Sequence, residues 1–314
     1  MSGMIKPAWT AGSMPDQTGR TVVVTGANSG LGLVTATHLA RGGAHVIFAV
    51  RNEARGRAAI ADLRTRHPAA SLELRLVDLA DLDAVRAFAD RLRADGIRVN
   101  VLINNAGVMM PPRGLSPQGH ELQFAANHLG HFALTGLLLE TLSAGKDPRV
   151  VTVSSVMHRR GSIRFEDLTG ADRYSPTAFY SQSKFANVLF GLELDRRLRA
   201  AGSPVRSLLA HPGYSATNLA SNGPTGIVRR LGRLGNRLVA QSADRGALPQ
   251  LYAATHPDAG GGQFIGPSGP GELRGHPAVV RPVAAAADPV LARRLWELSE
   301  TLTGVTYGLP PVSP

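Results

Sequence analysis

The chain has 314 residues, of which 43% are hydrophobic and 18% charged, and it contains no cysteine. The lack of cysteine excludes disulfides, a thiolate nucleophile and a Cys-ligated metal. The net charge is +11, but its arginines are dispersed along the chain, so we interpret the charge as compositional and expect no nucleic-acid partner. No apolar run approaches the roughly 20 residues of a membrane span, and residues 1–19 lack the apolar core of a secretory signal. We therefore expect a cytoplasmic protein.

Short runs rich in β-branched residues alternate with longer helical segments from residue 21 onward. The runs predict strands at 22–24, 45–50, 72–76, 99–103, 149–153, 205–210 and 263–265. The segments between them predict helices at 53–67, 81–93 and about 118–142. Two further helices are predicted, one that ends near residue 40 and one that contains residue 180 and ends at residue 199. Strands buried on both faces and separated by helices are typical of a parallel sheet with right-handed crossovers. We predict an α/β fold, with a doubly wound parallel sheet of about seven strands and helices on both faces.

A glycine-rich turn follows the first strand and opens a helix. Gly26, Gly30 and Gly32 let the backbone approach a pyrophosphate, and the N-terminal amides of the helix favour its negative charge. In this βαβ context the turn predicts a dinucleotide site. At the end of the second strand, Arg51 and Asn52 stand where an acid would accept the 2′-hydroxyl of NAD, whereas arginine suits the 2′-phosphate of NADP. NADP is therefore favoured, and NAD stays open.

Tyr180 is followed four residues later by Lys184, one of only three lysines among 34 basic residues. Residues at this spacing share one face of a helix. A cation close to a phenol favours its charged form, so we expect Lys184 to lower the pKa of Tyr180 toward the range of a general acid–base catalyst. A chance pair on a surface helix is the alternative at this stage.

Polar residues also follow the fourth and fifth strands. The Asn-Asn-Ala-Gly segment at 104–107 is placed where ligands bind in open α/β sheets. Ser154 and Ser155 put hydroxyls at the end of the fifth strand, where a serine donates to a carbonyl or a developing alkoxide; a serine that only caps a turn is the alternative. His128 and His131 have helical spacing but no evident third ligand, so we predict packed histidines rather than a metal site.

Together these residues resemble the classical short-chain dehydrogenase/reductase family. The resemblance covers roughly residues 20–265 and rests on five ordered motifs: TGxxxGxG at 25–32, NNAG at 104–107, a serine at 155, YxxxK at 180–184 and Pro-Gly at 212–213. Segments 124–132, 183–187 and 272–275 are similar to the retinol-dehydrogenase and WW-domain-oxidoreductase branch. The resemblance implies a single-domain Rossmann-type fold.

The resemblance also implies a catalytic tetrad. Tyr180 would protonate the carbonyl oxygen during reduction, and Lys184 would hold the nicotinamide ribose and lower the Tyr180 pKa. Ser155 would orient the carbonyl, with Ser154 as its rival, and Asn127 would hold a water that connects Lys184 to solvent. The implied cofactor contacts are Gly26, Ser29, Gly30, Leu31, Gly32, Arg51, Asn52, Asp78, Leu79, Asn105, Ala106, Gly107, Tyr180, Lys184, Pro212, Gly213 and Thr217.

Two features depart from the family pattern. The gap from Ser155 to Tyr180 is 25 residues, longer than in the shortest members, and predicts an extra excursion that shapes the substrate mouth. Ser29 stands where many NADP-dependent members carry a basic residue. We predict an NADP(H)-dependent oxidoreductase that acts on a carbonyl or alcohol group of a lipophilic small molecule, with an NADP-binding regulatory sensor without turnover as the alternative. A monomer and a homo-oligomer both stay open.

No change of composition suggests a boundary inside the domain. We expect a flexible lead-in at 1–19, one dinucleotide-binding and catalytic domain at 20–303 and a C-terminal tail at 304–314. Residues 223–245 have apolar residues at helical spacing among arginines, which predicts a basic amphipathic helix. In the family this region covers the substrate, so we expect a lid that packs on the core; contact with a membrane surface is the alternative.

Overall fold

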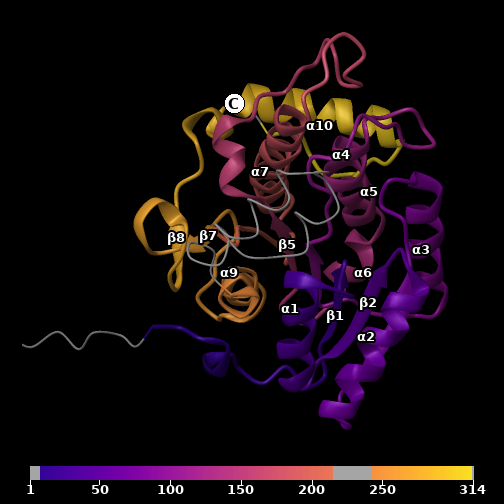
Figure 1. Cartoon of the computed structure of the whole chain (residues 1–314), viewed down its shortest axis with the longest axis vertical. Coiled ribbons are helices and arrows are strands. Elements are labelled where there is room, and N and C mark those ends of the chain that lie inside the picture. Colours follow the sequence, from indigo (N-terminus) through magenta and orange to yellow (C-terminus); the bar gives the residue numbers. More distant parts are fainter. Residues whose placement is uncertain (1–7, 215–241, 313–314) are drawn as a thin grey trace, which may run out of the picture.

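The computed structural model describes residues 8–214 and 242–312 (Figure 1). Its centre is an eight-stranded sheet with the order β3-β2-β1-β4-β5-β6-β7-β8. The strands are β1 (Thr21–Thr25), β2 (His45–Val50), β3 (Leu72–Leu76), β4 (Val101–Asn104), β5 (Arg149–Val153), β6 (Arg206–Ala210), β7 (Phe264–Pro267) and β8 (Pro277–Val280). Strands β1 to β7 pair in parallel, which confirms the predicted doubly wound sheet. The eighth strand was not predicted; it pairs antiparallel with β7, and none of its four residues is fully buried.

Helices connect the strands and cover both faces of the sheet (Figure 1). The α-helices are α1 (Gly30–Arg41), α2 (Glu53–Arg66), α3 (Leu82–Ala94), α4 (Leu122–Phe124), α5 (Gly130–Leu137), α6 (Leu139–Ser143), α7 (Pro176–Ala200), α9 (Ala243–Thr255) and α10 (Pro289–Thr303). Short helices are η1 (Ala11–Ser13), η2 (Ala125–Leu129), η3 (Val156–Arg160), η5 (Pro270–Glu272) and η6 (Ala284–Ala287), of which η2 is a π-helix.

Alternate residues of each strand enter opposite layers of the core. Val22 and Val24 of β1 pack with residues of α1, α2 and α9, whereas Val23 packs with residues of α3, α5 and α7. This follows from the period of two along a strand. Helix α10 lies over α5 and α7 as a further layer (Figure 1). Its Trp296 is buried against Phe132 of α5 and Phe190 of α7.

The predicted helix at 118–142 is wrong in its start and its continuity. It begins at Leu122 and contains the π turn Ala125–Leu129 before α5. A Cβ on Gly130 would lie 2.1 Å from the carbonyl oxygen of Leu79, so the helix passes directly against the chain after β3. A π turn inside a helix often marks a functional site.

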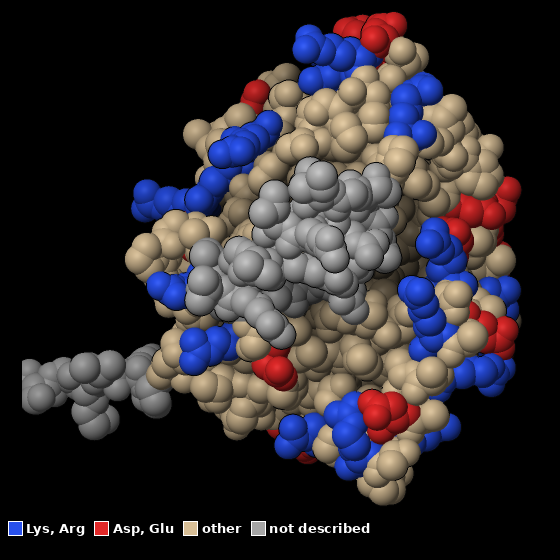
Figure 2. Space-filling view, viewed as in Figure 1, with Lys and Arg blue, Asp and Glu red and all other residues tan. Residues whose placement is uncertain are grey.

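Parts of both expected terminal segments are packed. Trp9 is buried and its ring meets Tyr252 edge-on at 5.4 Å, while Tyr307 is buried and donates to the carbonyl oxygen of Phe132 over 2.5 Å. The expected lid lies outside the described residues except for 242–245, and so does Thr217. None of the helices in the described part of the chain is long and apolar enough to cross a membrane. Figure 2 shows basic and acidic side chains interspersed on the face it presents.

Candidate functional site

The glycine turn between β1 and α1 is tightly packed against the loop after β4. Gly26 and Gly30 have φ of 69° and 54°, a region that strongly favours glycine. A Cβ on Gly32 would lie 2.4 Å from the carbonyl oxygen of Gly26 and 2.6 Å from Nδ2 of Asn105. Each of the three glycines is therefore required by backbone conformation or by close approach.

The N-terminus of α1 is suited to an anion. The first-turn amides of Gly30, Leu31 and Gly32 have no intrahelical acceptor, as at any helix start. Ser29 is the N-cap residue, and its side chain makes no capping hydrogen bond to this turn in the described structure. Because these donors also lie at the positive end of the helix dipole, the turn fits a pyrophosphate.

Thr25 joins this turn to the Asn-Asn-Ala-Gly segment. Its Oγ1 accepts hydrogen bonds from the amides of Asn105 and Ala106, each over 2.9 Å, and its carbonyl oxygen accepts from Nδ2 of Asn105 over 2.8 Å. Gln250 of α9 donates to Thr35 of α1 and lies 3.4 Å from Oδ1 of Asn105. Neither Thr25 nor Gln250 was predicted as a site residue; Thr25 belongs to the glycine motif, but no local sequence pattern marks Gln250.

The ends of β2 and β3 bring Arg51 and Asp78 together. The Arg51 side chain is 67% exposed, and its Nη1 lies 3.7 Å from Oδ2 of Asp78, a loose pair that leaves the guanidinium accessible. Asn52 is the N-cap of α2 and accepts from the amide of Arg55 over 2.9 Å. Leu79 is buried beside Asp78. All four residues therefore lie at the carboxyl ends of β2 and β3, where the family resemblance places the adenosine half of a dinucleotide.

The two serines after β5 have different roles in the structure. Ser154 is buried and its Oγ donates to the backbone carbonyl of Lys184 over 2.8 Å, which binds β5 to α7. Ser155 accepts from the amide of Met157 over 3.2 Å, and its side chain is also hydrogen-bonded to Tyr180. The side chain that faces Tyr180 is thus Ser155, and Ser154 is structural.

The expected lowering of the Tyr180 pKa is wrong. Burial raises the pKa of Tyr180 to about 12, and the hydrogen bond from Ser155 offsets only part of this. Burial also lowers the pKa of Lys184 to about 8. The Lys184 ammonium lies 6.0 Å from the centre of the Tyr180 ring and donates to the carbonyl oxygen of Val153 over 3.1 Å. Desolvation by burial is therefore the dominant cause of the raised Tyr180 pKa.

Asn127 lies in the π turn and faces the loop that follows β4. Its Oδ1 accepts from the amide of Val108 over 2.8 Å, and its Nδ2 donates to the carbonyl of Val108 over 3.0 Å and to Ser183 over 2.9 Å. A Cβ on Gly107 would lie 3.0 Å from Oδ1 of Asn127 and 3.6 Å from Nζ of Lys184. Gly107 thus lies close to both the side-chain amide of Asn127 and the ammonium of Lys184. The implied water between them stays a prediction.

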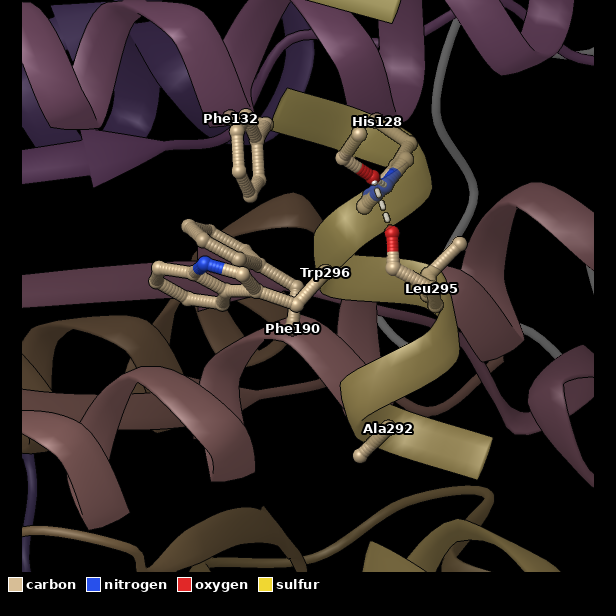
Figure 3. Close-up of a pocket in the computed structure, with 7 residues that line it drawn as sticks. His128, Phe132, Phe190, Ala292, Leu295 and Trp296 are labelled. Atoms are coloured by element: carbon tan, nitrogen blue, oxygen red, sulfur yellow. Dashed lines mark hydrogen bonds between the residues drawn. The ribbon is translucent and has the colours of Figure 1, made fainter. Parts of the chain in front are cut away.

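The two histidines of this region are buried and hydrogen-bonded. His128 Nε2 lies 2.9 Å from Ser299 Oγ, and His131 Nε2 lies 2.9 Å from Thr25 Oγ1. Burial lowers their pKa values to about 3 and about 4. Figure 3 shows His128 in a small apolar pocket between α5, α7 and α10. No expected catalytic or cofactor-binding residue lines this pocket, so it is not the candidate site.

The turn after β6 and the long excursion before α7 complete the site. Gly213 has φ of 65°, and a Cβ there would lie 2.5 Å from the carbonyl oxygen of Leu273. In the excursion, the Tyr174 hydroxyl donates to the carbonyl of Pro111 over 3.1 Å and lies 3.2 Å from the buried carboxylate of Glu121. The excursion is therefore hydrogen-bonded to the loop after β4, the loop that also contacts Asn127.

The chain is similar to known proteins over nearly its whole length. The family model for short chain dehydrogenase matches residues 20–226. The chain is 40% identical to mouse polyprenol dehydrogenase over 94% of this chain and 87% of that protein. It is 39% identical to human retinol dehydrogenase 13 over 96% of this chain and 91% of that protein.

Solved structures give the same result. A protein from Mycobacterium paratuberculosis superimposes with a TM-score of 0.79 at 48% identity, over 96% of this chain and all of that one. A short chain dehydrogenase from Shigella flexneri, solved in complex with NADP, shares the fold with a TM-score of 0.60 at 22% identity, over 80% of this chain and 98% of that one. The chain therefore belongs to the short chain dehydrogenase family, and the similar members named above include a polyprenol dehydrogenase and a retinol dehydrogenase.

Proposed function

We propose that the protein is an NADP(H)-dependent oxidoreductase that transfers a hydride between the nicotinamide and a carbonyl or alcohol group of a lipophilic small molecule. The observation that carries the proposal is the convergence of Ser155, Tyr180 and Lys184 at the carboxyl ends of the central strands, next to the glycine turn. Ligands of open α/β sheets bind at this edge. When bound, the dinucleotide supplies or accepts the hydride.

Proton transfer is assigned to Tyr180. With its pKa near 12, the hydroxyl is protonated at neutral pH and is ready to donate to a carbonyl oxygen during reduction. Ser155 is hydrogen-bonded to the same phenol, and when a substrate binds, its hydroxyl turns its single proton to the substrate oxygen. Lys184 places its ammonium beside the phenol, stabilises the phenolate that remains and holds the ribose hydroxyls.

The preference for NADP is supported by the end of β2. An exposed arginine, Arg51, stands there in place of the carboxylate that would accept the 2′-hydroxyl of NAD. The same cofactor was bound in the Shigella flexneri relative. The lipophilic character of the substrate is supported by the names of the relatives, which act on polyprenol and retinol.

The test is oxidation of NADPH, with NADH alongside, in the presence of long-chain aldehydes and ketones. Tyr180→Phe is expected to reduce kcat by about 10²–10⁴-fold, while NADPH affinity, measured by fluorescence, stays unchanged. Tyr252→Phe is the matched control because its ring packs against Trp9 and His256, away from the site residues. NADPH binding without turnover of any substrate, in wild type and variant alike, would instead indicate a regulatory sensor.

A further inference from the structure

A chain of polar contacts links the 212–213 turn to the segment that follows Ser155. Arg159 in η3 donates from Nη2 to Oε1 of Glu272 over 2.6 Å. The other carboxylate oxygen of Glu272 lies 2.9 Å from Nε2 of His211. The amide of Gly213 donates to Nδ1 of the same imidazole over 3.2 Å. One carboxylate therefore joins η3, the end of β6 and η5.

The hydrogen bonds define the proton position on His211. Because Nδ1 accepts from the amide of Gly213, it carries no proton, so the ring proton is on Nε2 and is donated to Glu272. The His211 side chain is fully buried, whereas Glu272 is 20% exposed. The carboxylate thus fixes both the tautomer and the orientation of a buried ring, and that ring in turn holds the Gly213 amide.

The backbone at Glu272 is strained. Glu272 has φ of 58°, which L-residues rarely adopt, and it follows Gly271 at φ of 61°. Strain of this kind persists only where surrounding contacts over-determine it, and it is concentrated at functional sites. Here the contacts are the bonds of the carboxylate to His211 and Arg159.

The Gly213 turn lies directly on this strained segment. A Cβ on Gly213 would lie 2.5 Å from the carbonyl oxygen of Leu273 and 2.9 Å from that of Glu272. The carbonyl of Ser155 is tied to the same C-terminal region, because it accepts from Nδ1 of His158 over 2.7 Å while Nε2 of His158 accepts from the amide of Val283 over 3.3 Å. Glu272 itself contacts both sides of the site, the Gly213 turn through His211 and the segment after Ser155 through Arg159.

We propose that Glu272 is a positioning residue that couples the Gly213 turn to the Ser155 segment, so that dinucleotide and substrate oxygen are held in register. It acts through His211 on one side and Arg159 on the other, without touching either reactant. This inference rests on the proposed function, in which Gly213 contacts the dinucleotide and Ser155 the substrate oxygen.

Three substitutions separate the links of this chain. Glu272→Gln removes the charge that accepts from both Arg159 and His211. His211→Asn keeps an acceptor where Nδ1 stands, in reach of the Gly213 amide, but loses the donor to Glu272. His211→Gln keeps a donor near Glu272 but loses the acceptor for Gly213. Asp90→Asn, in an exposed ion pair with Arg93 on α3, is the charge-matched control.

The first measurement is hydrogen–deuterium exchange at Gly213 in the protein without dinucleotide. Loss of one hydrogen bond to a charged or buried partner corresponds to about tenfold faster exchange, expected for Glu272→Gln and His211→Gln but not for His211→Asn or Asp90→Asn. The second is NADPH affinity by fluorescence, expected to fall by about tenfold in the Glu272 variant and in both His211 variants. Turnover should then show a lower kcat as well as a higher KM.

Unchanged Gly213 exchange, NADPH affinity and kcat in Glu272→Gln, with only a lower Tm, would overturn the proposal and leave a structural ion pair. If Glu272→Gln does not fold, Arg159→Met tests the same coupling at a residue 39% exposed, with the same direction of change expected. If both single variants fold, the Arg159→Met/Glu272→Gln double variant should lose no more NADPH affinity or kcat than Glu272→Gln alone, because the two residues belong to one series of contacts. Additive losses would contradict the proposal. A wild type that binds no NADPH would refute the proposed function, while the exchange measurement still decides the coupling.

Discussion

Lys184 donates a hydrogen bond from Nζ to the carbonyl oxygen of Val153, the last residue of β5, over 3.1 Å. Asn187, one turn further along α7, lies 3.3 Å from the same oxygen. The helix that carries Tyr180 is thereby fastened to the strand that leads into Ser155. The lysine is only 4% exposed and its pKa is lowered to about 8 by burial. A buried ammonium costs stability, and such groups are typical of functional sites.

Lys184→Met is expected to stabilise the protein at pH 7 while abolishing turnover. The folded pKa lies below the unfolded value of 10.5, so the unfolded state binds more protons between about pH 8 and pH 10.5, and wild-type stability rises with pH across that window. Below pH 8 the wild type bears the full cost of the charge, on the order of 2–4 kcal/mol. The advantage of the variant should therefore be largest below pH 8 and vanish above pH 10.5.

Chemical denaturation at pH 7 and pH 10 measures this difference. Lys146→Met is the control, since Lys146 is exposed, and it should change the free energy of unfolding by no more than about 0.5 kcal/mol. A Lys184→Met variant less stable than wild type at pH 7 would show that the hydrogen bond to Val153 outweighs the burial of the charge.

Gly32→Ala should weaken dinucleotide binding and destabilise the fold. The added Cβ would be 2.4 Å from the backbone oxygen of Gly26, which has no flexible side chain to yield. We expect a loss of about 1–3 kcal/mol in the free energy of unfolding, as for overpacked cores, with NADPH affinity lowered because Gly26 and Asn105 must shift. Gly12→Ala is the control, because its Cβ would meet no atom closer than 3.7 Å. Calorimetry and NADPH titration measure the two effects; wild-type affinity in Gly32→Ala would exclude the turn as the binding site.

Arg51→Asp should shift the cofactor preference from NADPH toward NADH. The new carboxylate repels a 2′-phosphate and accepts from a 2′-hydroxyl. Loss of a charge-assisted contact, worth about 1.5–3 kcal/mol, predicts roughly a 10- to 100-fold lower kcat/KM with NADPH. Arg66→Ala should leave the preference unchanged, because Arg66 is in an exposed ion pair with Asp62 at the C-terminal end of α2, the helix that follows Arg51. An unaltered ratio in Arg51→Asp would mean that another group reads the 2′ position.

Asp147→Asn should destabilise the sheet at the amino-terminal ends of β1, β5 and β6. Asp147 is the shared partner of Arg20, Arg149 and Arg206, and Arg149 is only 1% exposed. Removal of the charge leaves three guanidinium groups to repel one another. Because Asp147 is itself 39% exposed, we expect a loss of about 1–3 kcal/mol, below the range for fully buried pairs. Asp62→Asn, in an exposed pair, should have little effect.

The pH dependence at Asp147 follows from the direction of its pKa. Burial alone would raise this pKa, but the hydrogen bond and charge of Arg149, with the charges of Arg206 and Arg20, lower it below 3.8. A carboxylate whose pKa is lower in the folded than in the unfolded state stabilises the fold at neutral pH. This stabilisation is lost as the pH falls through the pKa of the folded state. The difference between wild type and Asp147→Asn, measured by denaturation, should therefore shrink in acid; a constant difference down to pH 2 would contradict the role of the charge.

The sequence alone determined the strands, the order of the motifs and the family. Buried strands leave continuous runs of β-branched residues, and glycines that permit positive φ or close approach stand at defined places after them, so Gly26, Gly30 and the 180–184 pair could be predicted from local pattern. The seven parallel strands were predicted for the same reason. The eighth was not, because its apolar run at 277–280 is only four residues long and begins with a proline, which disfavours a strand except at the edge of a sheet.

Only the tertiary structure decided which atoms meet. Ser154 and Ser155 are adjacent in sequence, yet one bonds to the backbone of α7 and the other faces Tyr180. The Tyr180 pKa depends on desolvation by surrounding side chains, a quantity absent from the spacing to Lys184. Glu272 meets His211 and Arg159 across separations of 61 and 113 residues. Contacts between residues so far apart in the sequence depend on the order in which the strands pair in the sheet, and no local sequence pattern predicts them.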